Sequence, residues 1–414
     1  MPKHARIQSH MQQEQRLVNL NRFPEAKTLY AEVSRLDPRQ VEAWFMLGAI
    51  NGQLGLFEEA EACCRKAIGL QPTLAEAYNN LALVQRMQGR LDAAIDTCQQ
   101  GLRIAPHHAD LHNNLGVALE SENRLDAALQ AYGQAIAAKP AHAEYHFNRA
   151  NVLFRLHRPD EAEAGYRHAL QLQPADPQAL NNLGNLLQTQ DRLEEAGQCY
   201  QAILALLPQH AESHYNLGNV LKKQGRLEDA IACYRHAIGL QADVPLFHQN
   251  LGHALESLGD LDTALACYRQ AVALQPGFAD AWYNIGTILQ NRGVLEEAAD
   301  CYRQAIASVP DHSRAHHNLS LLEMSRGNFA TGWRHYAARP SVRQRELISA
   351  PAALAQDLRG QRILLVKDQG LGDELFFLRF AWELKRRQAH VAYLPDPRLA
   401  DMILRSGCVD QILD

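Results

Sequence analysis

A spacing of 34 residues organises most of this 414-residue chain, and prolines mark it. The prolines on this grid are Pro38, Pro72, Pro106, Pro140, Pro174, Pro208, Pro276 and Pro310, with Ala242 in the one intervening slot. A repeat of this length is typical of a stacked array, in which each unit buries its apolar face against its neighbours. The period therefore indicates a repeat array over most of the chain.

Numbering each unit so that the proline is position 32 gives ten units. They begin at Ile7, Val41, Ala75, Ala109, Ala143, Pro177, Ala211, Pro245, Ala279 and Ser313. Position 8 is small in most units, position 20 is alanine in the first nine, and position 24 is mostly tyrosine. Position 15 holds only Gly, Asn, Asp or His, which tolerate a left-handed backbone. Each unit is thus predicted to be two helices joined by a turn at position 15, with the proline ending the second helix.

This combination of a small residue, an alanine, an aromatic residue and a proline resembles the tetratricopeptide repeat (TPR) over residues 7 to about 340. The resemblance implies a right-handed superhelix of antiparallel helix pairs, in which the first helix of each unit (helix A) lines an inner groove. We therefore expect a mostly α fold: a TPR superhelix, or α-solenoid, of about ten helix pairs, followed by a short partial Rossmann-like α/β segment.

The cysteines and histidines within the units follow the same register. Cysteines recur at positions 23 and 24, which are too far apart in successive units to form one ligand cluster, so they are interpreted as packing thiols in a reducing compartment. Histidines recur at position 4, a slot that Trp44, Tyr78 and Trp282 occupy elsewhere. We interpret them as packing residues and predict no metal site and no cofactor.

Position 6 is asparagine in eight successive units. These position-6 asparagines are Asn80, Asn114, Asn148, Asn182, Asn216, Asn250, Asn284 and Asn318. At about 100° per residue, position 6 lies far from the apolar stripe of helix A, so the helical wheel predicts that its side chain is exposed. Exposed neighbours at position 13 have diverged freely, whereas position 6 has not.

Each amide offers two donors and an acceptor, so a row of them can bind an extended peptide backbone whatever its side chains are. The row resembles the asparagine ladder of O-GlcNAc transferases, which bear Asn at position 6 of consecutive repeats. The alternative is that the amides bond between neighbouring repeats, or persist from a recent duplication.

The chain changes character after the array. Residues 1–6 are expected to be a tail, 7–340 the ten repeats, 341–361 a linker and 362–414 a partial Rossmann-like segment. In that segment a strand over 363–367, helices over 374–387 and 397–406, and strands over 389–394 and 409–413 predict a parallel sheet. Gly370 and Gly372 allow a sharp turn at the end of the first strand, where open α/β sheets bind ligands. Asp373 is either a helix N-cap or a general base.

The run Gly327-Asn-Phe, Gly332-Trp, Tyr336 followed by Asp368-Gln-Gly-Leu-Gly-Asp373 resembles bacterial proteins that join a TPR array to a glycosyltransferase-like domain. That domain is similar to the ADP-heptose glycosyltransferases of the GT-B fold. The resemblance implies that Asp373 is the acceptor-activating base. It covers about 55 residues, which is less than one of the two halves that a GT-B enzyme needs, so a nucleotide-sugar partner is expected only with a complete domain.

Two functions remain open from the sequence. One is a scaffold that binds a peptide or protein in an Asn-lined groove and recruits substrates for a glycosyltransferase-type protein. The other is an active glycosyltransferase, similar to O-GlcNAc or ADP-heptose transferases, of which this chain is a truncated form. A formal net charge of -5 argues against nucleic-acid binding. No apolar run is long enough to cross a membrane, and the N-terminus has no secretory h-region, so a cytoplasmic location is expected.

Overall fold

A computed structural model describes residues 22–337, 358–366, 381–394 and 399–413. The chain divides into two compact parts, Met1–Leu322 and Glu323–Asp414. No helix among the described residues is both long and apolar enough to cross a membrane.

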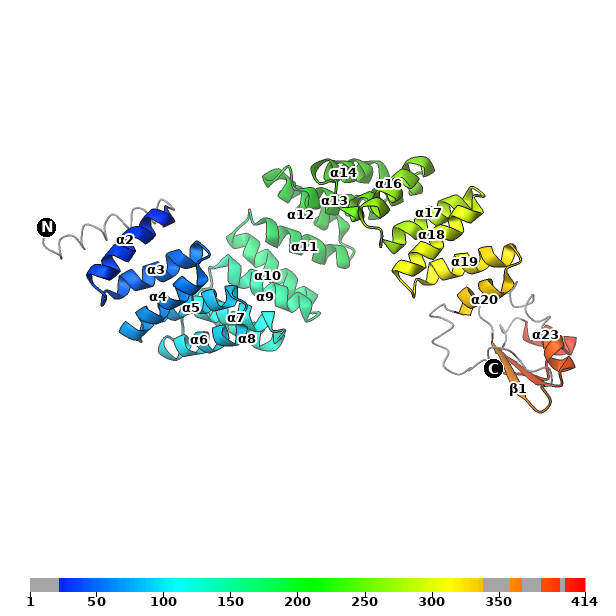
Figure 1. The fold of residues 1–414 in the computed structure, drawn as a ribbon, viewed down its shortest axis with the longest axis horizontal. Coiled ribbons are helices and arrows are strands. Elements are labelled where there is room, and N and C mark those ends of the chain that lie inside the picture. The colour runs from blue at the N-terminus through cyan, green and yellow to red at the C-terminus, as the bar shows by residue number, and fades with distance from the viewer. Residues whose placement is uncertain (1–21, 338–357, 367–380, 395–398, 414) are drawn as a thin grey trace. The chain divides into compact units, whose positions relative to one another are not determined.

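The first part is a succession of antiparallel helix pairs that stack in chain order (Figure 1). Helix A of units two to ten is α3 (Val41–Gln53), α5 (Ala75–Met87), α7 (Ala109–Ser121), α9 (Ala143–Arg155), α11 (Pro177–Thr189), α13 (Ala211–Lys223), α15 (Pro245–Ser257), α17 (Ala279–Asn291) and α19 (Ser313–Ser325). The second helix (helix B) of units one to nine is α2 (Phe23–Leu36), α4 (Phe57–Leu70), α6 (Leu91–Ile104), α8 (Leu125–Ala138), α10 (Pro159–Leu172), α12 (Leu193–Leu206), α14 (Leu227–Leu240), α16 (Leu261–Leu274) and α18 (Leu295–Ser308). Helix α20 (Phe329–Ala337) has the helix B register of unit ten and belongs to the second compact part of the chain. The predicted array of helix pairs is confirmed over the described units.

The turns and helix ends follow the residues that predicted them. All nine described residues at position 15 adopt a left-handed backbone, including the non-glycine residues Asn123, His157 and Asp191 at φ of 60°, 56° and 60°. Helix B ends at position 30 in units two to nine, and the residue before the proline is extended, as at Gln71 and Gln275 with ψ of 87° and 91°. A proline ring clashes with a helical residue before it, which favours this ending in the units that carry the proline. In unit seven, where Ala242 replaces the proline, helix B ends at the same position and Gln241 is extended as well.

A tyrosine ring lying against a glycine forms the centre of most pairs. In unit seven, a Cβ atom added to Gly218 would lie 2.7 Å from Cε1 of Tyr234, so no larger residue fits without a shift. The same contact recurs at Gly116, Gly184, Gly252 and Gly286. The tyrosines at position 24 of units four to nine are at most 1% exposed, so this contact is the core of the pair.

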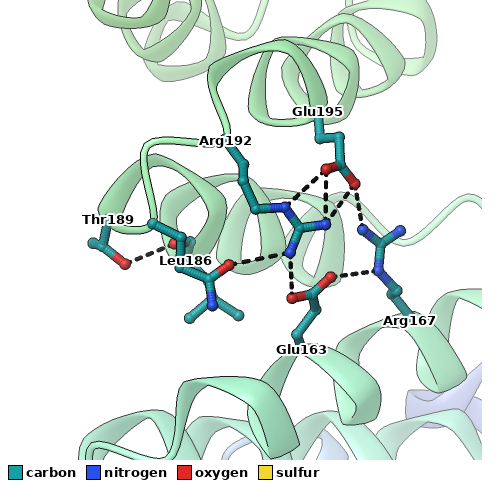
Figure 2. Close-up of polar contacts among 7 residues, drawn as sticks. Glu163, Arg167, Leu186, Thr189, Arg192 and Glu195 are labelled. Carbon is teal, nitrogen blue, oxygen red and sulfur yellow. Dashed lines mark hydrogen bonds and ion pairs between the residues drawn. The ribbon is translucent and has the colours of Figure 1, made fainter.

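Charged side chains link successive helix B elements. Arg192 bridges Glu163 at 2.6 Å and Glu195 at 2.7 Å, and Arg167 bridges the same carboxylates at 2.8 and 2.6 Å (Figure 2). Burial opposes ionisation of Glu163, but hydrogen bonds from Arg192 and Arg167 outweigh it and lower the pKa of this carboxyl. The cluster therefore stabilises the junction of units five and six only while its carboxylates are charged.

The second part of the chain contains a small parallel sheet of β1 (Arg362–Val366), β2 (His390–Leu394) and β3 (Gln411–Ile412), in that order. Helix α23 (Ala400–Ser406) precedes β3, and residues 381–386 are helical. Buried Val391, Tyr393 and Ile403 belong to its core. The predicted parallel sheet is confirmed, while the linker region 341–357 and the predicted turn after the first strand lie outside the described residues.

Replacement of Gly218 by Leu is expected to destabilise unit seven by about 1–3 kcal/mol, because the new side chain must displace the ring of Tyr234. Hydrogen exchange should rise mainly in α13 and α14 and their neighbours, since repeats couple chiefly to adjacent repeats. Gly239→Leu in α14 is the matched control, because no atom lies within 4 Å of a Cβ added there. A uniform rise over the whole array would contradict this view.

Replacement of Glu163 by Gln is expected to lower stability at pH 7 and to lose this effect in acid. A carboxyl whose folded pKa lies below its ordinary value of 4.5 stabilises the fold above about pH 4.5, and this contribution is lost as the pH falls through the folded pKa. Urea denaturation at pH 7 and at about pH 3 measures the difference from the wild type, which should shrink at the lower pH. Glu194→Gln, which removes an exposed carboxyl of α12 outside the ion-pair cluster, is the matched control and should lower stability less at pH 7.

Candidate peptide-binding face

The face formed by successive A helices carries the position-6 asparagines. Neighbouring A helices contact one another, as α3 does with α5 and α5 with α7, so residues at positions 5, 6 and 9 of adjacent units come together. None of the eight asparagines is fully exposed, and Asn216 and Asn284 are buried, with 9% and 6% of their surface accessible. The predicted exposure is wrong because a single helical wheel omits the neighbouring helix that covers part of this face.

Seven of the eight amides donate a hydrogen bond to another side chain. The Nδ2–acceptor pairs are Asn114–Asn79 at 2.8 Å, Asn148–Asn113 at 3.0 Å, Asn182–Asn151 at 2.9 Å, Asn216–Asn181 at 3.2 Å, Asn250–Asn219 at 2.9 Å, Asn284–His253 at 3.3 Å and Asn318–Tyr302 at 3.1 Å. Every acceptor belongs to the preceding unit. The amides thus connect successive repeats, which is the structural alternative left open by the sequence.

The tyrosines of the core extend this network. The hydroxyl of Tyr166 donates to Oδ1 of Asn151 at 2.8 Å, and the same oxygen accepts from Asn182 of the next unit. Tyr234 and Asn250 share Oδ1 of Asn219 in the same way. Position 9 therefore joins the packed core of one unit to helix A of the next.

The bonds within the array use only part of the hydrogen-bonding capacity of each amide. An amide has two N–H donors and one carbonyl oxygen, and one inter-repeat bond uses a single donor. Asn250 is the exception that uses Nδ2 twice, because it also donates to the hydroxyl of Tyr215 at 2.7 Å. The row is consequently held in a fixed orientation and retains hydrogen-bonding atoms.

Asn80 differs from the other seven members of the row. Positions 5 and 9 of the preceding unit are Phe45 and Ala49, whose side chains have no acceptor. Among the described residues, the side chain of Asn80 makes no hydrogen bond, and it is half-buried. Its amide is the one member of the row with no role in joining described repeats.

His253 takes the position-9 slot of unit eight. Burial, followed by the charge of Lys222, lowers the pKa of its imidazole, so the ring is neutral at pH 7. Its Nε2 lies 3.3 Å from Nδ2 of Asn284, and Nδ1 lies 3.2 Å from the hydroxyl of Tyr268. The neutral ring therefore replaces the asparagine amide as an inter-repeat acceptor.

The position-4 residues have a role that sequence reasoning missed. Nε2 of His112, His146 and His214 lies 2.8–3.0 Å from the carbonyl oxygen of the position-32 proline before it, and Trp44 and Trp282 donate Nε1–H to the equivalent oxygen. Tyr78 donates its hydroxyl to Pro72 in the same way, so a shared N–H or O–H donor, rather than aromatic bulk alone, unites these residue types. The signal that could have revealed it is that all three types (His, Trp and Tyr) carry a donor.

The cysteines of the array are unpaired, and six of the eight in the chain are buried. Burial raises the pKa of the Cys98 thiol to about 12 and that of Cys199 to about 11. A thiol with such a pKa is a poor nucleophile and metal ligand. These residues act as packing groups, as their register predicted.

Three sequence-predicted site residues, Gly370, Gly372 and Asp373, lie outside the described residues. The strand before them, β1, and the parallel neighbour β2 are described. The catalytic role of Asp373 and the turn function of the two glycines therefore remain predictions.

Profiles of the tetratricopeptide repeat match residues 39–106, 73–141, 113–179, 176–243 and 279–312, and a TPR repeat profile matches residues 255–293. The chain belongs to the tetratricopeptide repeat family. Proteins of this family serve as scaffolds for protein or peptide binding, and this coarse function applies to the chain. No protein of curated function is a significant match.

Several solved structures are similar to parts of this chain. YrrB, described as a TPR protein with an unusual peptide-binding site, is 28% identical; the match covers 46% of this chain and 98% of YrrB with a TM-score of 0.39. PilF of Pseudomonas aeruginosa is 22% identical over 49% of this chain and 92% of its own, with a TM-score of 0.45. Yeast Tom70 is 12% identical over 81% of this chain and 91% of its own, with a TM-score of 0.42.

Proposed function

We propose that the TPR array binds an extended segment of a partner peptide or protein along the helix A face, with the position-6 asparagines bonding to its backbone. The observation that supports this is a row of amides oriented by inter-repeat hydrogen bonds, each with hydrogen-bonding atoms to spare. An amide already fixed in place loses little conformational entropy when a ligand binds, which favours affinity.

Backbone recognition of this kind is independent of ligand sequence. The amide oxygen accepts from a peptide N–H, and the remaining amide N–H donates to a peptide carbonyl. Sequence preference must then come from neighbouring side chains on the same face. Unpaired cysteines in the array and the net charge of -5 support a cytoplasmic protein partner and argue against nucleic acid.

Asn80→Ala is expected to weaken peptide binding without loss of stability. Its side chain makes no hydrogen bond among the described residues, and alanine is the better helix former. Loss of one or two bonds of about 0.5–1.5 kcal/mol each should lower affinity roughly twofold to a hundredfold. The probe is a fluorescein-labelled dodecapeptide selected on the full chain from a random library, and anisotropy measures its binding.

The combined change of Asn182, Asn216 and Asn250 to Ala is the companion variant. It should lower affinity on the order of a hundredfold and also raise hydrogen exchange between units five and eight, because three inter-repeat bonds are lost. Wild-type affinity in both variants would show that the row does not bind the peptide. A library that yields no binding peptide would contradict the proposal as well.

A second candidate function is recruitment of substrate for glycosyl transfer, by this chain itself or within a larger glycosyltransferase-type protein. The parallel β1–β2–β3 sheet supports it, since such sheets bind ligands at the carboxyl ends of their strands, where Asp373 follows β1 in sequence. Asp373 would take the acceptor proton as general base, and a nucleotide sugar would be the donor.

Asp373→Asn in the full natural protein is expected to abolish transfer from radiolabelled UDP-N-acetylglucosamine or ADP-heptose while it leaves the fold intact. Asparagine can still cap a helix, but it cannot accept a proton as a carboxylate does. Circular dichroism and thermal melting check the fold. Wild-type transfer rates in the variant would remove the general-base role.

A further inference from the structure

A cavity of about 380 Å³ opens between α3 and α5, on the face that carries the asparagine row. Ala49, Gly52 and Phe57 line it from unit two, and Leu83 and Met87 line it from unit three. Asn80, the amide with no partner among the described residues, also lines it. This cavity is called the Gly52 pocket below.

The pocket exists because unit two lacks three side chains that fill the same space elsewhere. In unit six, Tyr200 at position 24 donates to Asn185 at position 9 and accepts from Gln188 at position 12, at 2.7 and 2.8 Å. Unit two has Cys64, Ala49 and Gly52 at these positions. All three residues of unit two are short, so they supply neither the phenol ring nor the two hydrogen-bonding side chains that unit six has at these positions.

The residues that line the pocket favour an uncharged, apolar ligand group. No charged residue lines the pocket, and Leu83, Val84 and Phe57 provide apolar surface. Met87 is 55% exposed, which is unusual for a large apolar side chain and leaves surface for a ligand to cover. The volume lies near the lower end of ligand pockets, so it suits one large side chain rather than a nucleotide or a cofactor.

We propose that the Gly52 pocket receives a side chain of leucine, methionine or phenylalanine size from an extended partner peptide, whose backbone bonds to the amide of Asn80. An extended segment is required because its backbone groups are free to bond, whereas those of a helix are already paired. An acyl chain would fill the pocket and leave the amide unpaired. The inference rests on the proposed peptide-binding function and adds to it the apolar residue that anchors the peptide.

Gly52→Leu tests the pocket by filling it from within. A Cβ atom at residue 52 would meet only Cγ2 of Val84, at 3.6 Å, which is an ordinary contact, and leucine forms helix better than glycine. Gly133→Leu in α8 is the matched control, because a Cβ atom there has no neighbour within 4 Å. Met87→Asp, at an exposed position, is a second variant that charges the pocket without disturbing the core.

The probe is the library-selected dodecapeptide described above, together with versions in which each of its apolar residues is changed to Asp. One position should prefer Leu, Met or Phe, and Asp there should lower affinity at least tenfold. Gly52→Leu and Met87→Asp should each lower affinity at least tenfold and abolish that preference, while Gly133→Leu should bind as the wild type does.

The outcomes separate the pocket from the asparagine row. Normal binding by Gly52→Leu, or selected peptides without a shared apolar position, would overturn the pocket even if Asn80→Ala still weakens binding. Loss of binding in Gly52→Leu alone would retain the pocket and reject the row. If analytical ultracentrifugation shows a wild-type dimer that Gly52→Leu dissociates, a second copy of the chain occupies the pocket and the proposal fails.

Discussion

The contact between a tyrosine ring at position 24 and a glycine at position 8 determines much of the array. The absence of a side chain on Gly184 or Gly252 lets the ring lie against helix A, fully buried. The ring is long enough that its hydroxyl emerges on the helix A face and bonds to positions 9 and 12. One packing contact therefore also sets the polar groups of the face where a ligand is proposed to bind.

The asparagine row shows why structural and binding roles are not exclusive. Asn182 connects two repeats through one N–H, yet its other polar atoms remain for a ligand. Holding the amide in place by an internal bond removes rotamers that a ligand would otherwise have to order. Asn80, without such a bond, is the member in which the two roles can be separated.

Local features were predictable from the sequence, and contacts between units were not. Left-handed turns at Asn123 and His157 follow from residue type, and the extended residue before Pro72 follows from pre-proline sterics. The partial burial of Asn216 depends on the preceding unit, which a single-helix projection omits. The donor role of His112 escaped notice because its acceptor, a carbonyl oxygen of the preceding unit, has no signature in the sequence.

Departures from the repeat pattern have a physical meaning when several occur together. In unit three, where position 24 is also the short Cys98, positions 9 and 12 carry the longer residues Leu83 and Arg86. Unit two instead combines Cys64 with Ala49 and Gly52, so a void remains open beside Asn80. Glycine at position 52 also weakens the helix. We expect such a combined loss of packing and helix propensity at a binding site, because functional sites depart from the sequence preferences that stabilise the rest of a fold.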